Sequence, residues 1–239
     1  GIALGTVTLP YLSRLWAKDD KQAFRQTLDW SLKIAFLIAV PAAIGLFMLA
    51  EPLVAALFFG GVFDEYAVRM TALALKAYAM GLVGFSFVKI LAPAYFARED
   101  TKTPVRIALL ALLANLILSV GLAWYMSINN IAGPHAGLAA ATSVAAALNA
   151  ILLYRGLRNT RILRHSAGWP IFLVRVAIAC IAMLAALNYL NRPIEWWIDA
   201  TFVGRVIWLA ISVSAGMGTY FLTMSLLGAK VEQFKLQAD

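Results

Sequence analysis

Six long apolar stretches dominate the chain, and short polar segments separate them. They run over residues 30–59, 67–97, 105–126, 136–157, 169–190 and 202–228. A helix of about 20 apolar residues, rising about 1.5 Å per residue, crosses the hydrocarbon core of a bilayer, and each stretch meets that length. Residues 1–16 look like the tail of a further helix. The pattern predicts an all-α, polytopic membrane helix bundle with six full transmembrane helices and part of a seventh.

Proline and small residues indicate how these helices bend and pack. Pro41 lies in the middle of the first stretch and Glu51-Pro52 near its far end, so this helix is expected to kink, because proline removes a helix hydrogen bond. Stretch 136–157 is rich in alanine, which lets helices approach closely and predicts a place inside the bundle. The polar segment 15–29 is interpreted as an amphipathic linker. The last stretch carries two small-xxx-small pairs that favour close packing: Ser212 with Gly216, and Ser214 with Gly218.

Composition supports a membrane environment. The chain is 62% hydrophobic and 13% charged, whereas soluble domains are about 45–50% apolar and about 25% charged. The net charge of +8 arises in short loops, without the basic stripe and interleaved aromatics of a nucleic-acid surface. The single cysteine, Cys180, excludes a disulfide within the chain, and no metal-ligand spacing or enzyme signature motif is present. We therefore expect no catalytic residues, no bound metal and no nucleic-acid partner.

Loop charge predicts the orientation of the chain. Alternate loops and the C-terminal tail carry thirteen basic residues: Arg14, Lys18, Lys21, Arg25, Arg98, Lys102, Arg106, Arg155, Arg158, Arg161, Arg164, Lys230 and Lys235. The opposite loops carry only Arg192. Because Lys and Arg accumulate in cytoplasmic loops, the basic loops and the C-terminus are expected to be cytoplasmic. The chain begins without Met and within an apolar run, so we expect it to be part of a longer protein.

Ionisable residues inside the apolar stretches are candidates for a transport pathway, because burying a charge in the bilayer is costly. Lys76, Lys89 and Arg69 all lie in stretch 67–97 and are predicted to line a polar cavity. Arg175 and Arg205 lie near the ends of the last two stretches, where they are expected to snorkel or bind lipid phosphate. The deep ionisable residues are cations, which favours an anionic substrate.

A seam of neutral polar residues follows the third and fourth stretches. Asn115 and Ser119 are four residues apart and share a helix face, as do Thr142 and Asn149, which are seven apart. Two interpretations remain open at this point. The seam either joins the two helices by hydrogen bonds or contributes to a site for an ion or a substrate.

Four blocks of the sequence resemble one family of transporters. They are TVTLPYLSR from residue 6, DWSLKIAFLIAVPAAIGL from residue 29, VKILAPAYFAREDTKTPVRIA from residue 88 and GLAAATSVAAALNAILLYRGLR from residue 137. In order and spacing they are similar to the MurJ (MviN) family of lipid II flippases, within the multidrug/oligosaccharidyl-lipid/polysaccharide exporter superfamily. The resemblance extends over essentially the whole chain, and the block from residue 88 is the most specific.

The resemblance implies a fold and an activity. It places residues 1–158 in the C-terminal transport lobe of a fourteen-helix transporter, with at least one helix of that lobe missing. Residues 159–239 would then form two additional helices with a short cytoplasmic tail, and these helices resemble a pair that forms a lipid-facing groove. The implied activity is movement of lipid II, a precursor for peptidoglycan biosynthesis, from the inner to the outer leaflet of the bacterial inner membrane by alternating access.

The resemblance also implies partners and leaves alternatives. The expected partners are lipid II, membrane lipids and the missing N-terminal lobe of the same protein, with membrane potential or ion coupling as the energy source. Some relatives hold sodium near the positions of Asn115 and Thr142, but Ser119 replaces the carboxylate expected one turn after the asparagine. The alternatives are a related exporter of polysaccharide repeat units or small molecules, and a membrane enzyme or scaffold. Against an enzyme, the apolar stretches lack clusters of His, Asp and Glu.

Overall fold

The computed structural model describes residues 2–129, 133–163 and 168–229. Within these ranges the regular elements are all helices: α1 (Ile2–Ala17), α2 (Lys21–Met48), α3 (Ala50–Phe58), α4 (Glu65–Phe96), α5 (Lys102–Ile128), α6 (Pro134–Asn159), α7 (Trp169–Leu190), α8 (Ile194–Asp199) and α9 (Phe202–Leu226). Six of them (α2, α4, α5, α6, α7 and α9) are long and apolar enough to cross a membrane. The predicted all-α bundle with six full spans is therefore confirmed.

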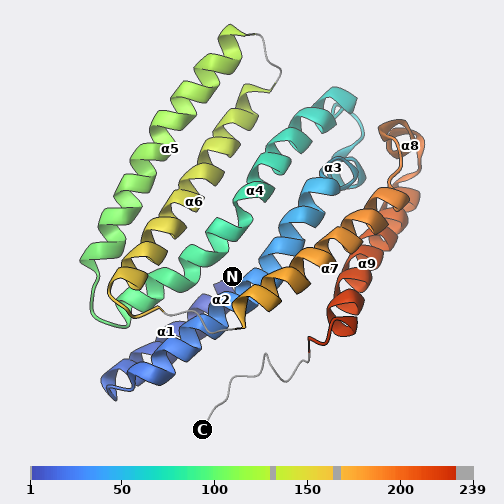
Figure 1. Ribbon diagram of the computed structural model, residues 1–239. Coiled ribbons are helices and arrows are strands. Elements are labelled where there is room, and N and C mark those ends of the chain that lie inside the picture. Colours follow the sequence, from blue (N-terminus) through green and yellow to red (C-terminus); the bar gives the residue numbers. More distant parts are fainter. Residues whose placement is uncertain (1, 130–132, 164–167, 230–239) are drawn as a thin grey trace.

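The long helices lie side by side across the bundle (Figure 1). Helix α6 lies between α5 and α4, and α2 packs on α4 away from α5. Helices α7 and α9 form a pair that packs against α2 and α3. The alanine-rich helix α6 thus lies inside the bundle, as its small residues predict, whereas α5 exposes most of its surface.

The first apolar stretch differs from its prediction in two ways. Helix α2 begins at Lys21, well before residue 30, because Asp20 caps it by accepting a hydrogen bond from the Ala23 backbone N–H at 2.9 Å. The segment 15–29 is therefore the end of α1, a tight turn and the start of α2. The stretch is also broken at Leu49 into α2 and α3. Pro52 explains the break, because it has no N–H to donate to the preceding turn but is tolerated in the first turn of α3.

Helices α4 and α6 approach each other closely because glycines line α4 at their crossing. A Cβ added to Gly81 would lie 2.7 Å from Ser143 Cα, and one added to Gly84 would lie 2.9 Å from the Ala147 backbone nitrogen. The Ser143 hydroxyl donates a hydrogen bond to the Ala77 carbonyl across the same interface at 2.6 Å. Small residues therefore set the distance between these two helices.

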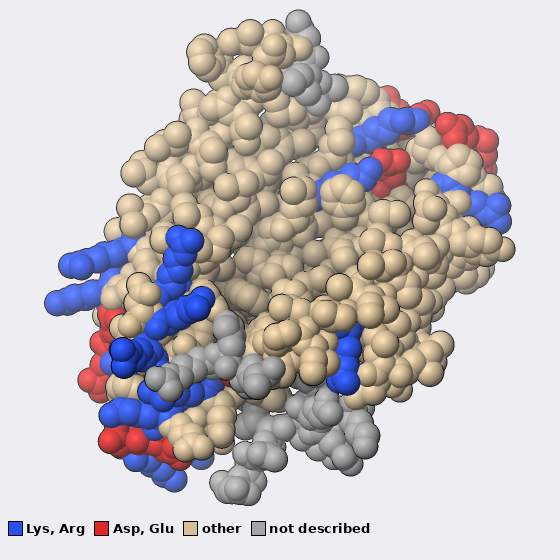
Figure 2. Space-filling model, in the orientation of Figure 1, with Lys and Arg blue, Asp and Glu red and all other residues tan. Residues whose placement is uncertain are grey.

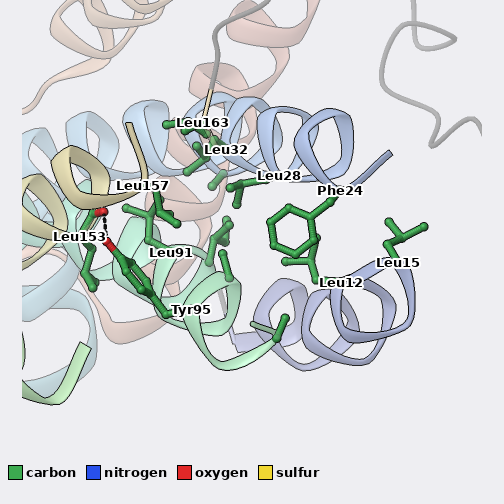
Figure 3. Close-up of a cluster of buried hydrophobic side chains, with 14 residues drawn as sticks. Leu12, Leu15, Phe24, Leu28, Leu32, Leu91, Tyr95, Leu153, Leu157 and Leu163 are labelled. Atoms are coloured by element: carbon green, nitrogen blue, oxygen red, sulfur yellow. Dashed lines mark hydrogen bonds between the residues drawn. The ribbon is translucent and has the colours of Figure 1, made fainter. Parts of the chain in front are cut away.

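A cluster of large buried side chains holds the ends of α1, α2, α4 and α6 together (Figure 3). Leu12, Phe24, Leu91 and Leu157 are at most 1% exposed within it. Tyr95 belongs to the same cluster and donates a hydrogen bond to the Leu153 carbonyl at 2.8 Å, which satisfies its buried hydroxyl. Buried apolar side chains therefore pack these four helices tightly against one another at this end of the bundle.

The two small-residue pairs of α9 behave differently. Ser212 and Gly216 are buried, and a Cβ on Gly216 would lie 3.0 Å from Leu187 Cδ2 of α7, as close packing predicts. Ser214 and Gly218 are exposed, and no atom lies within 4 Å of a Cβ added to Gly218. The prediction of close packing is therefore wrong for the second pair within the described residues, because it lies on the opposite side of α9 from α7.

Charge divides the bundle into two ends. Figure 2 shows most of the visible Lys and Arg gathered, with some acidic side chains among them, at the end where α1 and α2 meet, while at the end near α3 and α8 fewer basic side chains lie next to acidic ones. Arg164, Lys230 and Lys235, together with the predicted C-terminal tail from residue 230 onward, lie outside the described residues. The first end is here called the basic end and the second the mixed-charge end.

The loop between α4 and α5 offers a pH-dependent test. The Thr103 backbone N–H donates a hydrogen bond to Asp100 Oδ1 at 3.0 Å, and this bond lowers the pKa of the carboxyl group. Burial lowers the pKa of the neighbouring Arg98 guanidinium, whose charge also favours ionised Asp100. We expect Asp100→Ala to destabilise the protein by about 1 kcal/mol at pH 7, because the first turn of α5 loses its cap.

The sign of the pH dependence follows from the lowered pKa. The stabilisation by Asp100 is complete above its unfolded-state pKa of about 3.9, and it is lost as the pH falls through the lower folded-state value. Thermal melts of wild type and Asp100→Ala should therefore converge in acid. Asp100→Asn, which keeps an acceptor oxygen without the charge, serves as the control. A difference in melting temperature between wild type and Asp100→Ala that stays constant down to the lowest pH would contradict this assignment.

Candidate functional site

Four of the predicted pathway residues meet in one pocket between α4, α5 and α6. Lys89 comes from α4, Asn115 from α5, and Thr142 and Asn149 from α6, and all four line a cavity of about 310 Å³. Alanines and other apolar residues complete its walls. This cavity is here called the polar pocket.

Hydrogen bonds hold part of the polar pocket in place. Asn115 Oδ1 accepts a hydrogen bond from the Ser119 hydroxyl at 3.3 Å, and the Thr142 hydroxyl lies 3.5 Å from the same oxygen. The Thr142 hydroxyl has a shorter contact with the Leu138 carbonyl, at 2.9 Å. Of these three contacts, only the long one between Thr142 and Asn115 crosses from α6 to α5, so neither of the two interpretations of the seam is decided by them.

Two groups in the polar pocket keep unused hydrogen-bonding capacity. Asn149 Oδ1 is buried without a hydrogen-bond partner among the described residues. Lys89 is exposed and is not part of any ion pair in the described ranges. No Asp or Glu lines this cavity within the part of the chain that the structure describes. A ligand carrying negative charge or hydroxyl groups therefore matches the pocket better than a metal cation does.

Lys76 lies in a different cavity from Lys89. Its Nζ forms an ion pair with Glu51 Oε1 of α3 at 2.6 Å, and the two side chains are 28% and 35% exposed. Asn191 and Arg192, which follow α7, line the same cavity of about 310 Å³. Lys76 and Lys89 are thirteen residues apart on α4, or about 20 Å along the helix axis. The cavity around Glu51, Lys76 and Arg192 is here called the charged pocket.

Arg69 lies outside both pockets. Its guanidinium contacts Glu65 one turn earlier on α4, with Nη2 at 2.7 Å and Nε at 2.8 Å from Oε1, and both side chains are about half exposed. This is a surface i,i+4 pair. The place of Arg69 in a transport pathway therefore stays a prediction.

Arg205 has a different environment from the predicted one. It was expected on a lipid-facing surface, but it is 8% exposed. Its guanidinium donates to the carbonyls of Phe59, Ile198 and Ala200 at 3.0–3.1 Å and lies 3.5 Å from that of Ala55. Arg205 therefore caps the C-terminal ends of α3 and α8 from α9, because carbonyls at helix ends attract a cation.

Arg175 keeps part of its predicted environment. It is half-buried on α7, and its Nη2 lies 3.7 Å from the position of a Cβ added to Gly228, just beyond α9. Its role as a lipid phosphate anchor stays a prediction.

An apolar groove runs between α2, α7 and α9. It has a volume of about 370 Å³, and its walls are almost entirely hydrocarbon: they include Leu37, Pro41, Gly45, Met183 and Met217. Pro41 and Gly45 carry little side chain, and nothing lies within 4 Å of a Cβ added to Gly45. The shape and hydrocarbon walls of the groove match an extended hydrocarbon chain.

Sequence reasoning missed two residues of the charged pocket. Glu51 is 25 positions from Lys76 along the chain, so helix periodicity gave no signal that they pair. Arg192 did carry a signal, because it is the single basic residue in the loops opposite the basic ones. A lone cation on the side where Lys and Arg are scarce is a reason to look for a partner or a ligand.

Comparison with known proteins identifies the family. The family model described as "Lipid II flippase MurJ" matches residues 1–208. The chain is 34% identical to the probable lipid II flippase MurJ of Vibrio cholerae over 100% of its own length and 44% of that protein. It is 39% identical to the corresponding Haemophilus influenzae protein over 96% of the chain and 45% of the relative. It is 36% identical to the lipid II flippase MurJ of Burkholderia cenocepacia over 100% of the chain and 45% of the relative.

A solved structure has the same fold. It is a lipid II flippase MurJ in an inward closed conformation, which superimposes with a TM-score of 0.74 over 96% of this chain and 43% of that one, at 22% sequence identity. The chain therefore spans about half the length of the relatives that it matches. Its six apolar spans make it a multi-pass membrane protein. On the match of the family model to most of its length, the chain belongs to the MurJ lipid II flippase family.

Proposed function

We propose that the chain is one half of a bacterial lipid II flippase, a transporter and not an enzyme, which moves its lipid-linked substrate from the inner to the outer leaflet by alternating access. The named relatives are lipid II flippases, and the chain matches them over nearly its whole length. The proposed setting is the inner membrane with the basic end toward the cytoplasm. The C-terminus then lies on the cytoplasmic side as well.

The observation that supports this proposal most is the separation of polar and apolar cavities. The substrate joins a pyrophosphate and sugar head group to a long polyprenyl chain. The polar pocket offers the Lys89 cation and the unpartnered Asn149 oxygen to a head group. The apolar groove between α2, α7 and α9 offers a hydrocarbon surface to the chain. An amphiphile needs both environments, whereas a small soluble substrate needs only the first.

In this proposal the two parts of the chain have different roles. Residues 1–158 form the transport lobe, and residues 159–239 add the pair that borders the apolar groove together with α2. The rest of the same protein, corresponding to the other half of the relatives, supplies the facing lobe. Lys89 carries a charge that the membrane potential acts on, at about 2.3 kcal/mol per elementary charge for 100 mV across the whole membrane. Coupling to the potential or to an ion belongs to the proposal as its energy source.

Substitution of Lys89 tests the polar pocket. Lys89→Ala in the full-length protein should lower the rate of lipid II exposure on the outer leaflet at least 10-fold, because the pocket loses its only cation among the described lining residues. Cells depleted of their own flippase and complemented with each variant provide the assay. Lys102→Ala, which removes an exposed lysine at the start of α5, is the matched control and should keep full activity. If Lys89→Ala exposed lipid II on the outer leaflet at the wild-type rate, the assignment of the polar pocket to the substrate would be wrong.

The same cells test the substrate. Full-length wild-type protein should restore lipid II exposure and growth. If it is inserted in the membrane and fails to do so, the substrate is another lipid-linked or small molecule, and the family resemblance extends only to the fold.

A further inference from the structure

We propose that the charged pocket binds the head group of a zwitterionic phospholipid, with the phosphodiester at Lys76 and Arg192 and the ammonium at Glu51. This site is separate from the polar pocket, and it does not depend on which substrate the protein transports. The proposal rests on three features of the pocket: its charges, its level in the membrane and its position beside the apolar groove.

The charges of the pocket match a zwitterion. Lys76, Arg192 and Glu51 all line it and supply two cations and one anion. Lys76 Nζ touches the Glu51 carboxylate at 2.6 Å, so an anion reaching Lys76 alone is also held close to a carboxylate that repels it. A ligand that brings its own ammonium removes this repulsion, because the ammonium takes over the pairing with Glu51. A metal cation is disfavoured because the two basic side chains outnumber the carboxylate.

The position of the pocket matches the level of lipid head groups. Helix α7 has 22 residues and is therefore about 33 Å long, close to the thickness of the hydrocarbon core. Asn191 and Arg192 follow its last residue and so lie at the boundary of that core. Trp197 of α8 lines the same pocket and packs against Trp196, and tryptophans are typical of the interfacial region.

The apolar groove continues directly from the charged pocket. Met48 lines the charged pocket and its neighbour Leu49 lines the groove. On α7, Leu187 lines the groove, and Asn191 lines the pocket one helical turn later. A lipid whose head group occupies the pocket therefore has a hydrocarbon surface next to it for an acyl chain.

Arg192 is already held in place for such a contact. Its guanidinium lies over the Trp208 ring at 4.6 Å from the centroid, and Trp208 Nε1 donates to the Leu190 carbonyl at 3.2 Å. Stacking fixes the plane of the guanidinium while its edge stays able to donate hydrogen bonds to phosphate. Arg192 itself is exposed, so the pocket is accessible from the surrounding head-group region.

The experiment measures lipid binding to the purified full-length protein, without any transport assay. Native mass spectrometry gives the affinity for phosphatidylethanolamine and phosphatidylglycerol with identical acyl chains. We expect wild type to prefer phosphatidylethanolamine about 5-fold or more. Glu51→Gln should reverse this preference, because it removes the partner of the ammonium and the repulsion of the anionic lipid together. Arg192→Gln should weaken the binding of both lipids.

Each other outcome counts against the proposal. Equal affinity for the two lipids in wild type, or a preference that Glu51→Gln leaves unchanged, overturns the zwitterionic assignment. Tighter binding of phosphatidylglycerol by wild type would point to a purely anionic ligand. Because Arg192 is exposed, Arg192→Gln should fold normally, and unchanged binding of both lipids by this variant would exclude the pocket as a lipid site. A loss of lipid II exposure by Lys89→Ala has no bearing on these results, so the two proposals fail independently.

Discussion

Arg205→Met should destabilise the protein by about 3 kcal/mol or more, the largest loss expected from a change of one side chain near α3 and α8. The guanidinium donates hydrogen bonds to the carbonyls of Phe59, Ile198 and Ala200 from a buried position. Methionine keeps the bulk of the side chain and removes every donor. Carbonyls left without a partner away from water cost about 1–3 kcal/mol each.

The consequence extends beyond local stability, because Arg205 joins three helices. Helices α3 and α8 both end at its guanidinium, while Arg205 itself belongs to α9. Its ring contact with Phe59, with Cζ 4.7 Å from the centroid, adds to the same junction. We therefore expect Arg205→Met to loosen α8 and the start of α9 first, which hydrogen exchange of these segments would detect at temperatures below the main melting transition.

A graded series separates hydrogen bonding from charge. Arg205→Lys keeps the charge but has three donors in a different geometry, so its melting temperature should fall between those of wild type and Arg205→Met. Arg69→Met removes a half-exposed arginine near the start of α4, where it forms only a surface pair with Glu65, and should change the melting temperature little. Thermal melts of the full-length protein in detergent provide the measurement. Equal melting temperatures for Arg205→Met and Arg69→Met would contradict the capping role.

The helices of this protein could be predicted from sequence, and the reason is physical. A bilayer requires each span to satisfy its own backbone hydrogen bonds, so length and hydropathy nearly determine where helices lie. The start of α7 at Trp169 and its end at Leu190 coincide with the predicted stretch. The prediction for the first stretch was wrong at its start and missed the break inside it, because local features determine both. Asp20 extended α2 into a polar region, and Pro52 divided the stretch after Met48.

Side-chain partners could be predicted only where one helix or one regular seam determines them. Asn115 and Ser119 share a face of α5, and their hydrogen bond follows from the spacing. The pairing of Lys76 with Glu51 depends instead on the break between α2 and α3 and on how α3 packs against α4. Arg205 was placed at a lipid surface because its position near a helix end is ambiguous. Only the fold reveals that two other helices end beside it.

The second large effect is expected where α4 and α6 cross. Gly81→Ala and Gly84→Ala together should destabilise the protein by several kcal/mol, because both new methyl groups meet atoms that have no room to move. The Cβ at Gly81 would lie 2.7 Å from Ser143 Cα. The Cβ at Gly84 would lie 2.9 Å from the Ala147 nitrogen and 3.0 Å from the Ala146 carbonyl carbon. Overpacking costs about 1–3 kcal/mol per site where only side chains must shift, and here backbone atoms must shift as well.

The displacement of α6 should also reach the polar pocket. Thr142 and Asn149 lie on either side of the crossing on α6, while Lys89 lies on α4. Pushing the two helices apart widens the pocket and breaks the Ser143 contact with the Ala77 carbonyl. We therefore expect the double variant to lose both thermal stability and lipid II exposure. A single Gly84→Ala substitution should show a smaller loss of each.

Gly121→Ala in α5 is the matched control for this experiment. Gly121 is also a helical glycine, but no atom lies within 4 Å of a Cβ added there. Alanine favours a helix over glycine by about 0.8–1.0 kcal/mol, so this change should leave the protein as stable as wild type or slightly more stable. The measurement is the melting temperature of the double variant, Gly84→Ala and Gly121→Ala in the same detergent. If the double variant had the same melting temperature as Gly121→Ala, the crossing of α4 and α6 would tolerate added volume. The glycines would then not set the distance between these helices.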